Sequence, residues 1–236
     1  WEVPVGGPAL HHQALCEAPP WRRLDPDGAV FAALEPCFST DFERTRWTVR
    51  LRGGATIEVA LDVGVMVADG RTAPVCELEL ELLSGAPEAL FRLAVQIARR
   101  VAVLPLAASK AQRGFVLAQG MLDAPQGARP PAPARRASAQ ALAAPLLAEA
   151  FDQFAANLHS LLAADHPELV HQARVGWRRL RSAMRLLRPV LAVPPPDESG
   201  LQPLLDGLGA LRDLDVASTQ TLPTLRSAYV AGDAAR

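Results

Sequence analysis

Three consecutive segments of the sequence alternate apolar and charged side chains with a period of two, which is the spacing of a β-strand. The segments are residues 44–52, 56–62 and 76–82, and the Gly-Gly and Asp-Gly pairs between them are typical of tight turns. The charged positions hold arginines in the first segment and carboxylates in the next two. The pattern therefore predicts an antiparallel sheet with one apolar face and one charged face.

A proline-rich segment separates this region from one with a different period. Residues 121–139 are rich in Pro, Ala and Gly and predict an extended, semi-rigid linker. Apolar residues recur every three or four positions, as in a helix, in segments 87–101, 145–164, 167–188 and 201–215. Pro145 fits the first turn of the second of these helices. We therefore expect an α+β unit at residues 1–120, followed by an all-α helical bundle at residues 140–236.

The charge and cysteine content argue against several classes of protein. Basic and acidic residues number 24 and 25, so the net charge of −1 does not favour a nucleic acid or a membrane surface as partner. No apolar run in the sequence reaches the length of a membrane span. Three widely spaced cysteines argue against a disulfide framework and a zinc cluster, and the cytoplasm is the expected location.

The charged face of the predicted sheet holds Glu77, Glu79 and Glu81 at alternate positions of one strand. These carboxylates would repel one another, and a bound cation such as Mg²⁺ or Mn²⁺ would relieve the repulsion. Arg44 and Arg46 share this face, and arginine binds phosphate oxygens through two N–H groups. The pattern favours metal-assisted phosphoryl chemistry, and the alternative is a solvated face with weak cross-strand ion pairs.

Lys110 is the only lysine among the 24 basic residues of the chain. All the remaining basic residues are arginines. The single lysine is therefore kept either because its chemistry is required or by chance. Both explanations stay open from the sequence alone.

Four motifs occur in the order in which a known family has them, at residues 38–44, 57–64, 76–82 and 109–114. Together they resemble the C-terminal part of a CYTH domain, as in the triphosphate tunnel metalloenzymes and particularly the bacterial inorganic triphosphatases, where a CHAD domain follows. The resemblance implies an antiparallel β-barrel, a triphosphate tunnel, whose charged face points inward. We expect this barrel to be incomplete, because the family's Glu-x-Glu-x-Lys strand is absent and Trp1–Val5 resembles a later strand.

The same resemblance implies two sets of site residues on the charged face. Basic side chains would hold the phosphates, namely Arg44, Arg46, Lys110 and Arg113. Acidic side chains would hold Mg²⁺ or Mn²⁺ and serve as the catalytic groups, namely Asp62, Glu77 and Glu79.

The predicted helix at residues 167–188 carries basic charge along one face. Its basic residues follow spacings of three and four, namely His171, Arg174, Arg178, Arg181, Arg185 and Arg188. Like charges at these spacings repel, and an ordinary solvated face mixes both signs, so the pattern favours a polyanionic partner over a merely solvated face.

This helix resembles the signature helix of CHAD domains, and residues 211–216 resemble a second motif of that family. The resemblance covers the N-terminal part of the domain and implies a helical bundle with a groove that binds inorganic polyphosphate. The implied groove residues are His171, Arg174, Arg178, Arg181, Arg185 and Arg212.

We therefore expect a metal-dependent inorganic triphosphatase joined to a polyphosphate-binding domain, with inorganic triphosphate or polyphosphate as its partner. One alternative is a non-enzymatic polyphosphate-binding or targeting protein, and another is an adenylyl cyclase of the CYTH type. Whether this chain is itself an enzyme stays open here, because the expected barrel is incomplete. The sequence does not decide the oligomeric state.

Overall fold

The structure is a computed structural model of the chain, and it describes residue 7 and residues 9–132 and 136–233. The expected strand at Trp1–Val5 and the linker residue Pro133 lie outside the described residues. The first described elements are three short helices, α1 (His12–Cys16), α2 (Pro19–Leu24) and α3 (Ala29–Ala32). The sequence pattern predicts none of these three helices, because a helix of one or two turns is too short to show a periodic pattern.

The three alternating segments form one antiparallel sheet, as predicted. Its strands are β1 (Ser39–Arg50), β2 (Thr56–Ala68) and β3 (Arg71–Ser84), in the order β1-β2-β3. The described residues show an open sheet and not a closed barrel, and β1 and β3 are its edges. The α+β arrangement is therefore confirmed, whereas the closed tunnel is not shown.

Each face of the sheet is covered by a different helix, and the two helices lie toward opposite ends of β2. Helix α4 (Glu88–Ala98) packs through Ala89 and Leu93 against the apolar face, where Ile57 is fully buried. Helix α5 (Lys110–Ala118) packs through Leu117 against Met66 on the opposite face. The face that is charged near the middle of β2 therefore becomes apolar toward the end of the strand, which gives α5 a place to dock.

Residues 119–132, which follow α5, form neither helix nor strand, and they are attached to the helical unit. The Gln126 N–H donates to the side-chain oxygen of Asn157 at 3.0 Å, and the Asn157 amide donates back to the Gln126 carbonyl at 2.9 Å. Asn157 is fully buried, so this exchange satisfies a polar group that would otherwise be costly to bury. The Arg129 N–H also donates to Glu149. These contacts fix the linker against the first helix that follows it.

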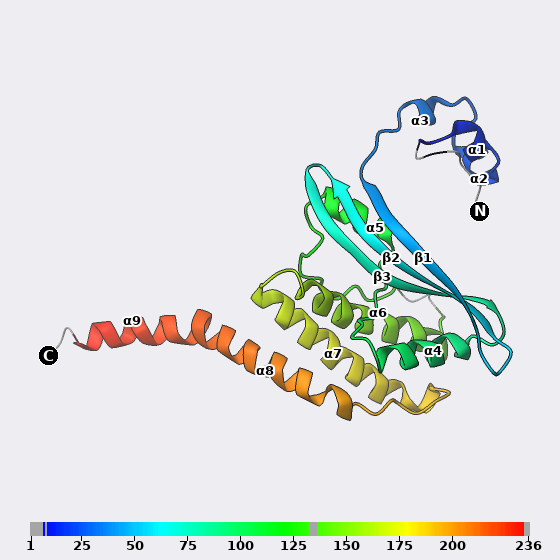
Figure 1. Cartoon of the computed structure of the whole chain (residues 1–236). Coiled ribbons are helices and arrows are strands. Elements are labelled where there is room, and N and C mark those ends of the chain that lie inside the picture. Colours follow the sequence, from blue (N-terminus) through cyan, green and yellow to red (C-terminus); the bar gives the residue numbers. More distant parts are fainter. Residues whose placement is uncertain (1–6, 8, 133–135, 234–236) are drawn as a thin grey trace.

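The helical unit comprises α6 (Ala139–Ser160), α7 (Pro167–Leu187), α8 (Gln202–Val216) and α9 (Leu222–Asp233), with 3₁₀ turns at Arg188–Val190 and Ser199–Leu201 and a π-helical turn at Ala217–Thr221. Figure 1 shows α6 and α7 side by side near the sheet, while α8 and α9 run in line away from it. No described helix is both long and apolar enough to cross a membrane.

The first helix of this unit begins before Pro145, so the predicted start is wrong. Ser138 accepts a hydrogen bond from the Ala141 N–H and caps the helix, and Pro145 lies inside it. The proline costs one backbone hydrogen bond, but the alanine-rich turns before it have high helix propensity and continue through it.

Helices α6 and α7 pack closely around Phe154 and Trp177, whose ring centroids lie 5.1 Å apart. Gly176 makes this approach feasible, because a Cβ atom there would lie 2.7 Å from the backbone nitrogen of Phe154. The apolar face of α7 is thus fully used by the core, and its basic face is directed elsewhere.

Candidate functional site

The register of the sheet gathers the predicted acidic residues. Asp62 on β2 lies opposite Arg44 on β1 and opposite Glu77 on β3. Glu79 follows Glu77 by two positions, so both point to the same face. Asp62, Glu77 and Glu79 each offer a carboxylate oxygen, and these oxygens lie within 4.8 Å of one another. The three predicted acidic residues therefore form one cluster.

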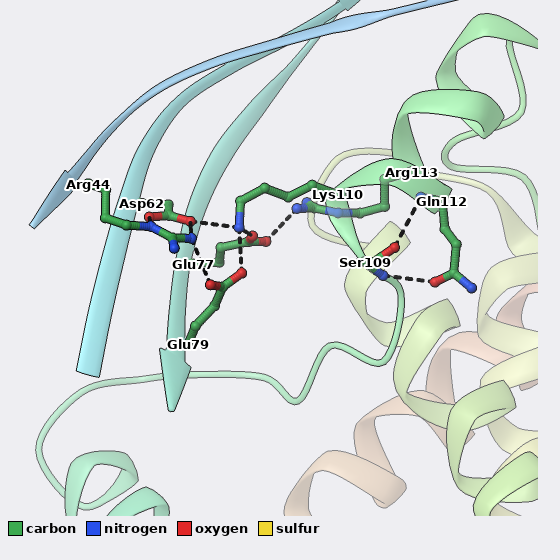
Figure 2. A network of polar contacts seen from close by, with 8 residues as sticks. All are labelled: Arg44, Asp62, Glu77, Glu79, Ser109, Lys110, Gln112 and Arg113. Carbon is green, nitrogen blue, oxygen red and sulfur yellow. Dashed lines mark hydrogen bonds and ion pairs between the residues drawn. The ribbon is translucent and has the colours of Figure 1, made fainter. Parts of the chain in front are cut away.

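Helix α5 carries two of the predicted basic residues, Lys110 and Arg113, to this cluster. Ser109 and Gln112 form a reciprocal capping box, in which the Gln112 N–H donates to Ser109 Oγ and the Ser109 N–H donates to Gln112 Oε1. The cap starts the helix at Lys110 and places Arg113 one turn later on the same side. Figure 2 shows both side chains reaching from α5 toward the strands.

A glycine lets α5 approach closely enough for these contacts. A Cβ atom on Gly114 would lie 2.3 Å from the ring of Phe38, so a larger residue would push the helix away from the sheet. The motif at residues 109–114 thus supplies a cap, two cations and a close helix–sheet contact.

The ammonium of Lys110 lies among all three carboxylates. Its Nζ atom is 2.6 Å from Asp62 Oδ2 and 2.6 Å from Glu79 Oε1, and it also pairs with Glu77. The Lys110 side chain is only 13% exposed, and the Asp62 side chain is completely buried. The side chain of Glu79 is 48% exposed, so the cluster meets solvent on that side.

Two arginines complete the cluster. Arg44 donates two hydrogen bonds to Asp62, at 2.6 Å from Nε and 2.7 Å from Nη2, and Nη2 also lies 2.7 Å from Glu79 Oε2. Arg113 pairs with Glu77. We call this set the sheet network; its members are Arg44, Asp62, Glu77, Glu79, Lys110 and Arg113. Its three cations and three carboxylates balance.

The ion pairs favour the charged forms of Asp62 and Lys110. The hydrogen bonds from Arg44 lower the pKa of Asp62 to about 2, although burial of the carboxylate opposes the shift. Burial alone would lower the pKa of Lys110, but its hydrogen bonds to the three carboxylates raise it above the ordinary value. At neutral pH the buried Asp62 carboxylate and the Lys110 ammonium are therefore both ionised.

One aromatic residue of this site, Phe42, is not among the predicted site residues. The ring of Phe42 has its centroid 5.1 Å from Lys110 Nζ and 5.6 Å from Arg44 Cζ, within the range of cation–π attraction. Phe42 lies opposite Gly64, where a Cβ atom would be 2.5 Å from Phe42 Cα. The only signal in the sequence is that Phe42 shares the alternation phase of Arg44, which does not indicate a role.

Arg46, the remaining predicted phosphate ligand, is not part of the sheet network. It lies on the same face, opposite Ala60, but it is exposed and has no ion pair in the described part of the chain. The next residues along this face, Glu58 and Glu81, lie opposite each other. Along this face of the sheet, Arg44 on β1 and Glu79 on β3 are thus the last residues of the sheet network.

A second basic site lies between α7 and α8. A groove of about 480 Å³ is lined by all six residues predicted for polyphosphate, namely His171, Arg174, Arg178, Arg181, Arg185 and Arg212. We call it the basic groove. Gly209 of α8 leaves room for one of its members, because a Cβ atom there would lie 2.9 Å from Arg174 Nη1.

The cations of the basic groove are mostly unpaired. Arg181 pairs with Glu198 at 2.8 Å, whereas the other groove arginines have no ion pair among the described residues. Arg179 lies beside the basic face of α7 but points instead to α6, where it pairs with Glu149 at 2.6 Å. Hydrogen bonds from Arg179 lower the pKa of Glu149. One arginine of α7 therefore joins the helices, while its neighbours face the groove.

Comparison with known proteins finds matches for the segments that hold the two sites. Residues 17–115 match the CYTH domain family, and residues 145–235 match the CHAD domain family. A stretch of 86 residues is 40% identical to the inorganic triphosphatase of Haemophilus influenzae and spans 36% of this chain and 24% of that protein. The sheet network lies within the first match and the basic groove within the second. The chain therefore contains a match to the CYTH domain family followed by a match to the CHAD domain family.

Proposed function

We propose that this protein hydrolyses inorganic triphosphate at the sheet network with the help of a divalent cation. The observation that carries the proposal is the convergence of three carboxylates and three cations on one face of a CYTH domain. The relative from Haemophilus influenzae supports the reaction, since it is named as an inorganic triphosphatase. In this proposal the sheet is one wall of the charged tunnel that the sequence motifs imply.

The residues of the cluster fit a divalent cation. Asp62, Glu77 and Glu79 offer only oxygen atoms, the ligands that Mg²⁺ and Mn²⁺ prefer. A positive group already lies between them, because the Lys110 ammonium contacts all three. The donor chemistry and the spacing of these oxygens are therefore suited to a metal ion, with Mg²⁺ or Mn²⁺ as the expected cofactor.

The basic side chains orient the substrate. Arg44 and Lys110 donate N–H groups to phosphate oxygens, and Arg113 contributes a guanidinium whose buried Nε has no acceptor among the described residues. Asp62 stays ionised because of its low pKa, so it remains an acceptor throughout. A bound divalent cation would polarise a phosphoryl oxygen and acidify a water molecule.

Charge balance explains why a cation is needed. The sheet network is neutral by itself, and inorganic triphosphate carries several negative charges at neutral pH. Additional positive charge must enter the site before the anion is stabilised there, since burying uncompensated charge is costly.

The basic groove supports a second function, the binding of inorganic polyphosphate. The carrying observation is that most of its arginines line one groove without carboxylate partners in the described structure. Such cations bind a polyanion without first breaking an ion pair.

The triphosphatase proposal is tested by phosphate release from tripolyphosphate with Mn²⁺. We expect the Glu77→Gln, Glu79→Gln double variant to lose at least about 100-fold in rate, as expected when metal ligands are removed. Glu81→Gln is the matched control, because it removes a carboxylate from the same strand face outside the sheet network. Equal rates for all three proteins would contradict the proposal, and cyclic AMP formed from ATP would favour the cyclase alternative.

A further inference from the structure

The position of Lys110 has a consequence for metal binding, which rests on the function proposed above. Its ammonium is bound by the same carboxylates that are proposed to hold a divalent cation. Two cations at that place would repel strongly, because the carboxylate oxygens lie within 4.8 Å of one another. The ammonium therefore cannot keep its contacts with the three carboxylates when a metal ion binds to them.

Lys110 gains nothing from its place in the helix. It is the first residue of α5, where the helix dipole disfavours a positive charge. Its side chain is 13% exposed, and its contacts are with the carboxylates and the Phe42 ring. The contacts that compensate this position are thus the ion pairs of the sheet network.

We infer that Lys110 is an internal counter-ion, which occupies the carboxylate cluster when no divalent cation is bound and turns to substrate phosphate when one binds. Departure of the ammonium makes room at Asp62, Glu77 and Glu79 and at the same time frees a phosphate ligand. Cation and anion binding are then coupled, and each raises the affinity of the site for the other.

The chemistry of lysine suits this exchange better than that of arginine. A compact ammonium on a flexible four-carbon chain has no fixed donor geometry, so it can move between two sets of acceptors. Arg44, in contrast, holds Asp62 through a two-point contact that fixes its orientation. The exposed side of Glu79 provides the direction from which a hydrated cation reaches the cluster.

The test is calorimetric titration of Mn²⁺ into the metal-free 236-residue chain without phosphate. Lys110→Gln removes the competing charge, and we expect its dissociation constant for Mn²⁺ to fall by about tenfold or more. Lys110→Arg keeps a cation and should bind Mn²⁺ no more tightly than wild type. Arg50→Gln is the control: it removes one exposed charge about 20 Å along β1 from Arg44 and should change the affinity less than about twofold.

A second measurement covers the effect of the substitution on folding. Without Mn²⁺, Lys110→Gln should unfold at a lower temperature than wild type, and saturating Mn²⁺ should raise its midpoint by more than it raises that of wild type. Lys110→Met keeps the length of the side chain without its charge and should behave in the same way in both measurements.

The outcomes separate this inference from the proposed function. If Lys110→Gln and Lys110→Met bind Mn²⁺ as weakly as wild type, Lys110 is not an internal counter-ion, while metal binding by the cluster stands. If wild type, Lys110→Gln and the Glu77→Gln, Glu79→Gln variant all fail to bind Mn²⁺, both the inference and the proposed metal site are wrong.

Discussion

The sheet network and the basic groove use their cations in opposite ways. In the sheet network every arginine and lysine has a carboxylate partner, and the positive and negative charges balance. In the basic groove only Arg181 has such a partner among the described residues. The difference has a geometric cause. Antiparallel strands bring side chains from different segments together, so basic and acidic residues can pair, whereas one face of a helix holds side chains of a single segment.

This difference teaches which additional component each site needs. In our proposal a divalent cation displaces Lys110 from its carboxylate partners, and this displacement couples metal binding to substrate binding in the sheet network. Unpaired cations bind a polyanion directly, and their attraction weakens as salt screens it. We therefore propose that the sheet network binds phosphate chains with a metal ion and that the basic groove binds them without one.

The largest expected effect is on stability, and it should occur in the sheet network alone. Asp62→Asn leaves Arg44 and Lys110 without their buried partner, and we expect a loss of about 3 kcal/mol in the free energy of unfolding. Arg178→Gln removes an exposed, unpaired charge from the basic groove and should cause no measurable loss. Urea unfolding of the two variants checks this, and similar losses in both would remove the distinction between the sites.

Acid should weaken the sheet network through the same carboxylate. The pKa of Asp62 is lowered to about 2, so its contribution is complete above about pH 4 and disappears as the pH falls toward 2. We expect about 2 kcal/mol of stability to be lost across this interval. The measurement is the difference in unfolding free energy between wild type and Asp62→Asn at several pH values.

The comparison with Asp62→Asn is necessary because a second carboxylate also responds to acid. The hydrogen bond from Arg179 lowers the pKa of Glu149, so its protonation also destabilises the folded protein in acid. A difference between wild type and Asp62→Asn that does not change with pH would contradict the assignment to Asp62.

The basic groove should reveal itself in binding and not in stability. Replacing Arg174, Arg178 and Arg181 together by Gln should weaken the binding of long-chain polyphosphate by about tenfold, and added salt should weaken wild-type binding steeply. Arg179→Gln is the matched control, since it removes an arginine of the same helix that contacts Glu149. We expect this control to lower the stability of the protein and to leave its affinity for polyphosphate unchanged. Neither wild type nor the control should need Mn²⁺ for this binding.

Circular dichroism must first show that each variant is helical. If the triple variant binds as wild type does, or if affinity does not change with salt, the basic face of α7 is only a solvated surface.

Several features were predictable because they depend on local periodicity. Alternation along each strand predicts that Asp62, Glu77 and Glu79 lie on the charged face, and the resemblance to CYTH domains implied that these three belong together. The spacing of the basic residues on α7 likewise predicted a single face, and the structure places that face in a groove. The predicted roles of these residues in catalysis and binding remain proposals.

Other predictions failed or were incomplete because they depend on contacts between distant segments. Arg44 and Arg46 have the same phase in the sequence, but only Arg44 lies opposite Asp62 and joins the sheet network. The attachment of the predicted linker to Asn157 could not be foreseen from composition. The sequence predicts a helix start at Pro145, whereas the cap at Ser138 begins the helix earlier.

The sequence by itself determined the faces of the strands and helices, because side-chain direction follows from backbone period and needs no tertiary contact. Only the tertiary structure decided that Lys110 contacts the carboxylate cluster. That contact requires α5 to dock through Leu117 and Gly114, and these interactions join residues far apart in the chain. Charge pairing depends on such distances, so the sequence predicted which groups are present, and the packing of α5 on the sheet decided which of them compensate one another.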